Sequence, residues 1–271
     1  MGADDAPHSS KSEKGDLQET SWQTLVEQVS SLQQFLQQSG VVAGDRVAAF
    51  LPCIPEATVS LLATASLGAV WSSCSPDFGT QSVLDRLVQI EPKVLIAVSH
   101  YSYNGKTHDK RDVIMALIQG LPSLQRVILI SEDIVDQNEK IVRWKDCLTI
   151  PSKTLHFKRV PFAHPLWILF SSGTTGLPKA ITHSHGGILL EQLKYGTFHN
   201  DFKEGEHCFW YTTTGWMMWN YIHGSLLAGA TMVLYDGSPA YPDLYVLWKF
   251  VEEAGIHHFG TSAGFIMANV K

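Results

Sequence analysis

Short apolar runs alternate with segments of helical periodicity along much of the chain, and this alternation constrains the fold more than any other feature. Residues 46–50, 70–72, 94–98 and 127–130 have the composition of strands. Between these runs, apolar side chains recur at helical spacing, as in Val83, Leu84, Leu87 and Val88. Strands that alternate with helices form βαβ units, so we expect an α/β fold with mostly parallel sheets.

The same patterns predict how the chain is divided. Residues 1–19 are polar and lack a signal-peptide core, so we expect a disordered tail. Thr20 opens a segment with capping-box spacing ahead of a helical apolar face, and Gly40 is placed to end that helix. We expect residues 20–150 to form a first α/β subdomain and residues 151–271 a second. The proline-containing stretch 131–165 is expected to be an irregular connection between two sheet systems.

A loop rich in Ser, Gly and Thr lies between two short apolar runs in the second half. Residues 167–170 read as a buried strand and residues 180–183 as a second strand. Glycines let successive backbone N–H groups turn toward an anion, while hydroxyls and a lysine add donors and positive charge. The stretch therefore predicts a polyphosphate site, with Lys179 stabilising phosphate charge and the set Ser171, Ser172, Gly173, Thr174, Thr175, Gly176 and Lys179 binding the phosphates.

Two other interpretations of this loop fit its residues less well. The common P-loop spacing fails, because Lys179 follows Gly176 by three positions and precedes Ala180. A flexible Ser/Gly linker is the simpler alternative. A linker would need neither the apolar strand before the loop nor the single lysine after it, so the phosphate interpretation is favoured.

The stretch Ser171–Lys179 resembles the phosphate-loop signature of the AMP-forming acyl-CoA synthetases, the adenylate-forming superfamily. Residues 71–79, 212–220 and 234–239 are similar to the acetoacetate-activating members of that family, and the resemblance runs from Thr20 to Lys271. It implies a partial large domain of an adenylate-forming enzyme, with two βα subdomains. Members of the family continue well beyond this length, so we expect a carboxy-terminal domain to be missing and the chain to be truncated.

The resemblance also implies a reaction and its substrates. An acid carboxylate attacks the α-phosphorus of ATP, and the thiol of CoA then displaces AMP from the acyl-adenylate. ATP and CoA are the expected co-substrates, Mg²⁺ is held mainly through the ATP phosphates, and acetoacetate is the expected acid. Acetate or propionate is the first alternative. A non-catalytic fragment that binds ATP or a partner is the second.

The acyl pocket is assigned by the same resemblance. The pair Gly215-Trp216 and the two residues after it correspond to the wall of the acyl pocket, so Trp216, Met217 and Met218 are the candidates for contacting the acid. Residues 215–227, however, read as a nearly all-apolar buried helix, in which methionine ordinarily fills the core. A role in the pocket and a role in the core therefore both stay open for the two methionines.

Charge and composition exclude some classes of binding partner and indicate the compartment. A net charge of −6 without a cluster of Lys and Arg argues against nucleic acid or an anionic membrane as a partner. No metal-ligating set is assigned, because the histidines lack a paired spacing beside acidic residues. Four dispersed cysteines indicate free thiols in a reducing compartment, so we expect a cytosolic protein. Phe265, Ile266 and Met267 form an apolar patch near the end of the sequence.

Overall fold

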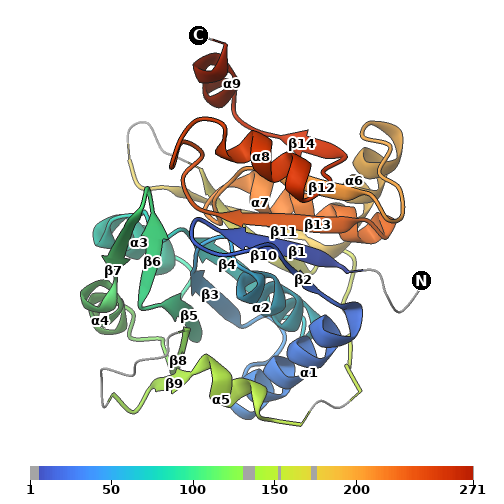
Figure 1. Ribbon diagram of the computed structural model, residues 1–271. Coiled ribbons are helices and arrows are strands. Elements are labelled where there is room, and N and C mark those ends of the chain that lie inside the picture. The colour runs from blue at the N-terminus through green and yellow to red at the C-terminus, as the bar shows by residue number, and fades with distance from the viewer. Residues whose placement is uncertain (1–5, 131–137, 152–153, 172–175, 271) are drawn as a thin grey trace.

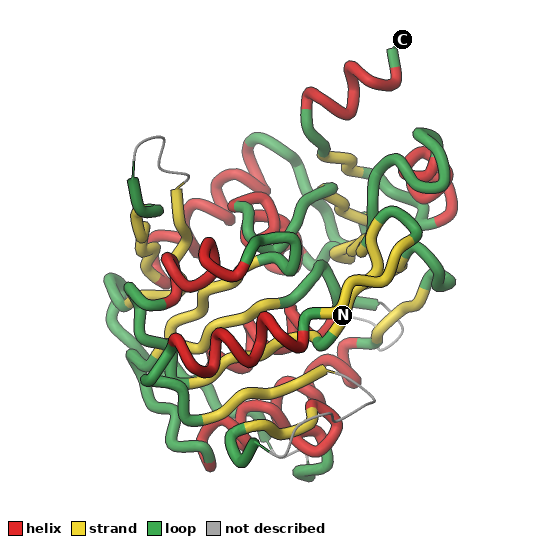
Figure 2. Tube along the Cα trace, turned by 90° about the vertical axis from the view of Figure 1, so that its left-hand side faces the viewer, coloured by secondary structure: helices red, strands yellow, loops and turns green. Residues whose placement is uncertain are grey.

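Two sheets and the helices around and between them make up the structure, which is a computed structural model describing residues 6–130, 138–151, 154–171 and 176–270 (Figure 1). Most strand pairs are parallel, which confirms the expected α/β class. The tube view in Figure 2 shows helices lying between strands of the two sheets as well as outside them.

The larger sheet has seven strands in the order β11-β10-β4-β3-β5-β8-β9. The pair β10–β11 is antiparallel and joins Ser171 to Lys179, whereas the remaining neighbours are parallel. Their bounds are β3 (Arg46–Phe50), β4 (Val70–Cys74), β5 (Val94–Val98), β8 (Arg126–Ile130), β9 (Ile141–Arg143), β10 (Pro165–Ser171) and β11 (Lys179–Ser184). The four strands expected near residues 46, 70, 94 and 127 are therefore confirmed, and the Ser/Gly/Thr loop does connect two strands.

The smaller sheet has five strands in the order β14-β12-β13-β1-β2. The strands β12, β13, β14 and β1 run parallel, and β2 pairs antiparallel with β1. Their bounds are β1 (His8–Ser12), β2 (Gln18–Thr20), β12 (His207–Trp210), β13 (Thr231–Asp236) and β14 (His258–Gly260). A separate hairpin is formed by β6 (His100–Tyr103) and β7 (Lys106–Asp109).

The expectation of a disordered tail over residues 1–19 is wrong for the part that the structure describes. The strand β1 lies beside β13, with His8 opposite Met232 and Ser12 opposite Asp236. His8 and Ser9 are buried. Pairing in a sheet uses backbone hydrogen bonds, so a polar segment can form a strand wherever a neighbouring strand offers its edge.

The two sheets do not follow the expected division at residues 150 and 151. The strands β10 and β11 belong to the larger sheet, and β1 and β2 belong to the smaller one. The stretch 131–165 also contains regular structure, namely β9 and the short helix α5 (Trp144–Leu148). The subdomain boundary stays a prediction.

Helices cover both faces of each sheet. One face of the larger sheet packs on α3 (Thr80–Leu87) and α4 (Arg111–Gly120), and the outer face of the smaller sheet packs on α8 (Val246–Glu253) and α9 (Ala263–Asn269). A central layer of α1 (Trp22–Gln38), α2 (Pro55–Ser66), α5 and α7 (Met217–Ile222) packs on the other face of the larger sheet, and its α7 also lies against β12 of the smaller sheet. Alternation within β3 serves both layers, because Val47 and Ala49 face the centre while Ala48 and Phe50 face α3 and α4.

The helix ends show which sequence signals were correct. Gly40 follows α1 with a positive φ of 78°, as a helix-ending glycine does. The cap at the start of α1 is Ser21 rather than Thr20, since the Ser21 hydroxyl accepts a hydrogen bond from Thr24 N at 3.1 Å. Residues 215–227 are not one buried helix: α7 ends at Ile222, and the 3-10 helix η1 (His223–Ala228) follows it.

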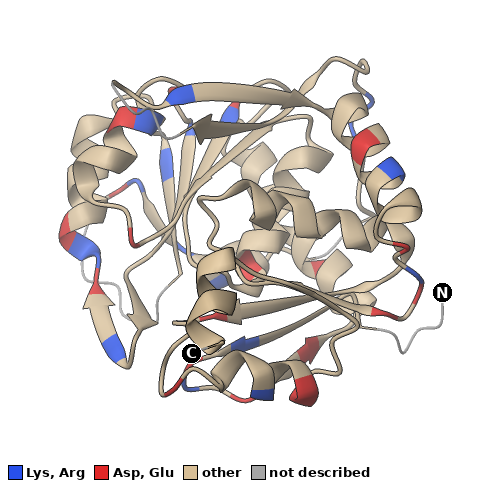
Figure 3. Cartoon of the chain, turned by 90° about the horizontal axis from the view of Figure 1, so that it is seen from above, with Lys and Arg blue, Asp and Glu red and all other residues tan. Residues whose placement is uncertain are grey.

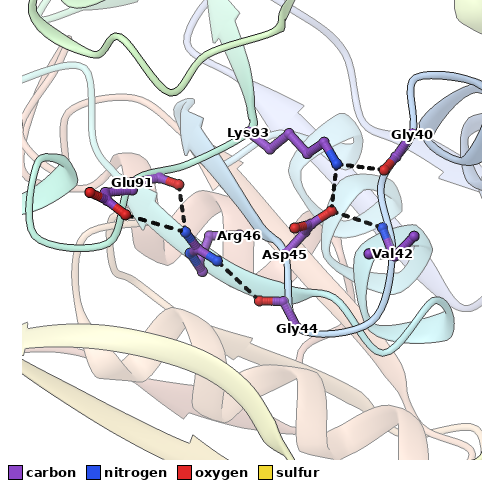
Figure 4. Close-up of polar contacts among 7 residues, drawn as sticks. All are labelled: Gly40, Val42, Gly44, Asp45, Arg46, Glu91 and Lys93. Atoms are coloured by element: carbon purple, nitrogen blue, oxygen red, sulfur yellow. Dashed lines mark hydrogen bonds and ion pairs between the residues drawn. The ribbon is translucent and has the colours of Figure 1, made fainter.

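A polar network closes the amino ends of β3 and β5 (Figure 4). The Lys93 amine donates to Asp45 Oδ2 at 2.9 Å and to Gly40 O at 2.6 Å, and Asp45 also accepts from Val42 N. Arg46 donates to the backbone of Gly44 and Glu91 beside it. The amino ends of these strands are therefore occupied by contacts within the chain. The carboxyl ends of the strands are left for a site.

Charged side chains are spread over the described elements (Figure 3), whereas exposed apolar side chains occur on the helix α9. Lys and Arg are interspersed with Asp and Glu along the described elements (Figure 3). The helix α9 stands out from the body at the carboxy end in both Figures 1 and 2. Its Phe265 is buried, while Ile266 and Met267 are exposed. Of the helices that the structure describes, none is long and apolar enough to cross a membrane.

Candidate active site

The carboxyl ends of parallel strands from both sheets converge on one region. Residues after β3 and β4 meet residues after β12 and β13 around a cavity of about 150 Å³. In open α/β sheets, ligands bind at this edge of the strands. The topology thus brings loops that are far apart in the sequence to a single place.

Direct contacts join the loops at this edge. The Ser73 hydroxyl, near the end of β4, donates to Thr214 O at 2.7 Å. The next residue is Gly215, where an added Cβ would lie 2.9 Å from the Phe78 ring. Because only glycine tolerates that approach without displacing the ring, the Gly-Trp pair is held against the loop after β4.

A second cleft, of about 380 Å³, adjoins the first and shares Tyr211, Thr212 and Thr213 with it. Trp216 and Met218 line this cleft, together with Thr261 and Ser262 from the end of β14. Met217 is not among its lining residues. We call this the acid cleft, defined by Trp210, Tyr211, Thr212, Thr213, Trp216, Met218, Thr261 and Ser262.

Two threonines of the acid cleft have buried hydroxyl groups for which the described residues offer no hydrogen-bond partner. Thr213 Oγ1 and Thr261 Oγ1 are buried, and neither has a hydrogen-bond partner among the described residues. Buried hydroxyls are normally paired, because leaving one unpaired costs about 1–3 kcal/mol. Trp216, by contrast, is 61% exposed and lies at the rim. The acid cleft therefore combines an apolar wall with two hydroxyls that a ligand could satisfy.

Asp236 lines the cavity of about 150 Å³, and its carboxyl has a raised pKa. Burial, together with the nearby carboxylates of Glu13 and Glu56, raises the pKa of Asp236 to about 7. Burial also raises the pKa of the Cys53 thiol to about 12, so this sulfur stays protonated and unreactive at neutral pH. The Asp236 carboxyl is therefore only partly ionised at neutral pH.

The predicted phosphate loop is only partly described. Ser172, Gly173, Thr174 and Thr175 lie outside the described residues. Ser171 ends β10 and is directly opposite Lys179, the first residue of β11. Lys179 is exposed, and an added Cβ at Gly176 would meet nothing within 4 Å. The described ends of the loop are therefore open to a ligand.

A metal ion held by protein groups alone would need several donor side chains close together. Within the described part of the chain, no three His, Cys, Asp or Glu side chains are grouped so that they could hold a metal ion. Mg²⁺ usually needs only one or two carboxylates when a substrate phosphate supplies further oxygens. The described residues are thus compatible with Mg²⁺ carried by a phosphate ligand, rather than with an ion held by protein groups alone.

Comparison with known proteins now identifies the family. Residues 4–268 match the AMP-binding enzymes. The chain belongs to this family.

Individual members of the AMP-binding enzyme family are similar over most of the chain. The acetoacetyl-coenzyme A synthetase of Rhizobium meliloti is 47% identical over 91% of this chain, and the acetoacetyl-CoA synthetase of Rattus norvegicus is 42% identical over 92%. The solved structure of the acetoacetyl-CoA synthetase from Streptomyces lividans has a TM-score of 0.94 and 48% identity over 98% of this chain. The chain spans 39%, 38% and 41% of the lengths of these proteins.

The acid cleft also contains two residues that no sequence motif marks as ligand contacts. Ser262 caps α9, because its hydroxyl accepts a hydrogen bond from Phe265 N at 3.2 Å, and Thr261 precedes it. The signal that could have found them is their position after a strand in a parallel sheet, since such positions meet at one edge. Thr213 lies within the stretch 212–220 that carries the family resemblance, although threonines there can also simply end a strand.

Proposed function

We propose that this chain forms the part of an ATP-dependent acetoacetate–CoA ligase that receives the acid and the phosphates of ATP. The reaction runs in two steps: an acid carboxylate oxygen attacks the α-phosphorus and pyrophosphate leaves, after which the CoA thiol attacks the acyl carbon and AMP leaves. The names of the similar AMP-binding enzymes support the substrate, and the acid cleft supports the manner of binding.

One observation carries the proposal, namely the unpartnered hydroxyls of Thr213 and Thr261 in the acid cleft. Acetoacetate offers a carboxylate, a keto oxygen and a terminal methyl group. A hydroxyl can donate to the keto oxygen, while Met218 and Trp216 offer an apolar surface to the methyl group. Acetate and propionate have no keto oxygen and would leave a hydroxyl unpaired. A site that pairs a substrate oxygen discriminates strongly against analogues that lack it.

The loop between β10 and β11 supports the proposed binding of the ATP phosphates. Ser171 and Lys179 lie at its two ends, so the hydroxyl and the ammonium can approach the same phosphate group. We assign the β- and γ-phosphates of ATP to Ser171, Ser172, Gly173, Thr174, Thr175, Gly176 and Lys179. The task of these residues is to hold ATP in line with the acid and to stabilise phosphate charge, which requires no covalent nucleophile.

The remaining assignments concern ligands and location. Mg²⁺ bound to the ATP phosphates would neutralise charge on the departing pyrophosphate, and we assign it no protein ligands. CoA is the proposed second substrate. All four cysteines are free and buried, which is consistent with a reducing compartment, and we infer the cytosol.

A chimera tests the proposal. The corresponding two-fifths of the Streptomyces lividans acetoacetyl-CoA synthetase would be replaced by residues 1–271. Acid-dependent exchange of labelled pyrophosphate into ATP would then be measured with acetoacetate, acetate and propionate, alongside the unaltered Streptomyces enzyme and this chain alone. We expect the chimera to exchange with acetoacetate at least tenfold faster, by kcat/KM, than with either other acid.

The alternatives give different results. A preference of the chimera for acetate or propionate would replace acetoacetate by a simpler acid. A folded chimera without exchange, beside an active parent enzyme, would favour a chain that binds ATP or a partner without catalysis. Exchange by this chain alone would mean that these residues carry the whole first step.

A further inference from the structure

A third cleft lies at the edge of the central helix layer and shares no lining residue with the acid cleft or its neighbour. Its volume is about 390 Å³. It lies among α2, α7, η1, the helix α6 (His185–Phe198) and the segment 160–167. We call it the helix cleft. Its walls are mainly apolar, and include Leu61, Leu62, Phe162, Ile188, Leu189 and Leu227.

The walls of the helix cleft are closely packed. An added Cβ at Gly186 would lie 2.1 Å from the Phe162 ring, and one at Gly224 would lie 1.9 Å from Gln192 Oε1. Both glycines therefore let a larger side chain lie directly against a helix backbone. Contacts of this kind make the cleft a formed feature of the fold rather than a loose gap between elements.

One residue of the helix-cleft lining carries a buried amide without a hydrogen bond to the described part of the chain. Asn220 on α7 lines the helix cleft and is fully buried, and neither its Nδ2 nor its Oδ1 has a partner among the described residues. Each unpaired buried polar atom costs about 1–3 kcal/mol. His185 Nε2, on the same lining, is likewise buried and unpaired. Such groups are expected where a ligand completes the hydrogen bonds.

The charge of the lining limits what can bind. No Lys, Arg, Asp or Glu is among the residues that form the helix cleft. Burial lowers the pKa of His223 to about 4, and burial with the nearby His164 lowers the pKa of His185, so both rings are neutral at pH 7. A buried charged ligand would find no counter-charge here, which favours a neutral one.

We propose that the helix cleft binds a small neutral molecule with an apolar body and a primary carboxamide, which pairs with Asn220. A carboxamide donates through its NH₂ group and accepts through its oxygen, so one ligand can satisfy both Oδ1 and Nδ2 of Asn220. The apolar body fills the space beside Phe162 and Leu227. This site is independent of the proposed ligase activity.

Calorimetric titration of the 271-residue chain tests the proposal with three matched probes. The probes are 3-phenylpropanamide, the charged 3-phenylpropanoate, and propylbenzene, which lacks a polar group. We expect the amide to bind at least tenfold more tightly than the other two. Asn220→Leu, which removes the unpaired amide, should weaken amide binding at least tenfold and raise the melting temperature of the free protein.

Two further variants locate the binding. Leu227→Trp fills the cleft from its exposed side and should weaken amide binding even if Asn220→Leu fails to fold. Trp216→Ala alters the acid cleft and should leave amide binding unchanged. Equal binding of the amide and propylbenzene, or undiminished binding by Asn220→Leu, would overturn the proposal in favour of an apolar hole. Absence of amide binding to the unaltered chain would also overturn it.

Discussion

The Thr214 hydroxyl donates a hydrogen bond of 2.5 Å to the carbonyl oxygen of Leu51, which lies 163 positions earlier in the sequence. The bond is buried and links the residue after β3 with the loop after β12. It therefore joins the carboxyl ends of the larger and smaller sheets, where the candidate active site lies. Thr214 itself is fully buried.

Replacing this link should destabilise the fold. Thr214→Val keeps the shape of the side chain but leaves Leu51 O without its donor, so the free energy of unfolding should fall by about 1–3 kcal/mol. Urea unfolding followed by circular dichroism measures the change. Thr149→Val is the control, because its hydroxyl bonds to Asp146 O on the surface. An equal loss in both variants would contradict a special role for Thr214.

The Glu13 carboxylate should hold three segments together. It accepts from Asn104 N at 2.7 Å, Gly105 N at 2.9 Å and Ser238 N at 2.6 Å. We expect Glu13→Ala to lower the free energy of unfolding by about 2 kcal/mol, since hydrogen bonds to a charged group are strong. Hydrogen exchange at residues 103–106 should accelerate with it. The exposed Glu19→Ala should change neither quantity, and unaltered exchange in Glu13→Ala would contradict this role.

Asp236 should make stability depend on pH. Its pKa rises from the ordinary 3.8 to about 7 on folding, so the folded chain binds more protons than the unfolded chain between these values. Its contribution to stability therefore falls as pH rises from about 4 to 7, because the buried carboxyl must then ionise. Asp236→Asn removes this effect.

The difference between Asp236→Asn and the unaltered chain isolates this carboxyl from other titrating groups. His8 acts in the opposite sense, since burial lowers its pKa to about 4 and its contribution is lost as pH falls below 6.5. Urea unfolding at pH 5 and pH 8 should show a gain in stability from Asp236→Asn that is larger at pH 8. The exposed Asp16→Asn serves as the control. A gain that is equal at both pH values would rule out the raised pKa.

Acid selectivity should depend on Thr261. In the chimera, Thr261→Val should lower kcat/KM for acetoacetate about tenfold, the size of effect that loss of one substrate hydrogen bond produces. Activity with acetate should stay nearly the same, because acetate has no keto oxygen. Thr212→Val is the matched control, since the Thr212 hydroxyl already bonds to Thr213 O. An equal loss with both acids would assign Thr261 a merely structural role.

Lys179 should act on the chemical step rather than on folding. Lys179→Ala in the chimera should slow pyrophosphate exchange about 100-fold, as expected when a donor to developing charge is removed. Its melting temperature should be nearly unchanged, because Lys179 is exposed. Lys194→Ala, whose amine pairs with Glu191 on α6, is the control. A lower melting temperature with normal exchange would contradict the phosphate role.

Sequence patterns predicted the parts of the fold that depend on local periodicity. The strands near residues 46, 70, 94 and 127 and the helical segments between them follow from apolar spacing, which needs no knowledge of distant contacts. The strand β1 could not be found in this way. Its sequence His8–Ser12 is polar, and it forms a strand only because β13 lies beside it.

Some residues of the proposed sites can be recognised from the local sequence, whereas others can be found only from packing. The Ser171–Lys179 loop and the Gly215–Trp216 pair are recognisable in the sequence, because glycine and hydroxyl residues at close spacing restrict the backbone and its ligands locally. Thr261 and Asn220 carry no such signal. Each matters because its polar side chain is buried without a partner, and burial is a property of the packed chain.

The sequence by itself determined the alternation of strands and helices, the loop between two strands and the family to which they belong. Which strands share a sheet, and that loops after β3, β4, β12 and β13 meet at one end of the sheets, follow only from the packed chain. The same holds for which of the described hydroxyl and amide groups are buried without a hydrogen-bond partner. The physical reason is range: periodicity and turn geometry act between neighbours in the chain. Sheet order, burial and hydrogen bonds such as that from Thr214 to Leu51 depend on residues that folding alone brings together.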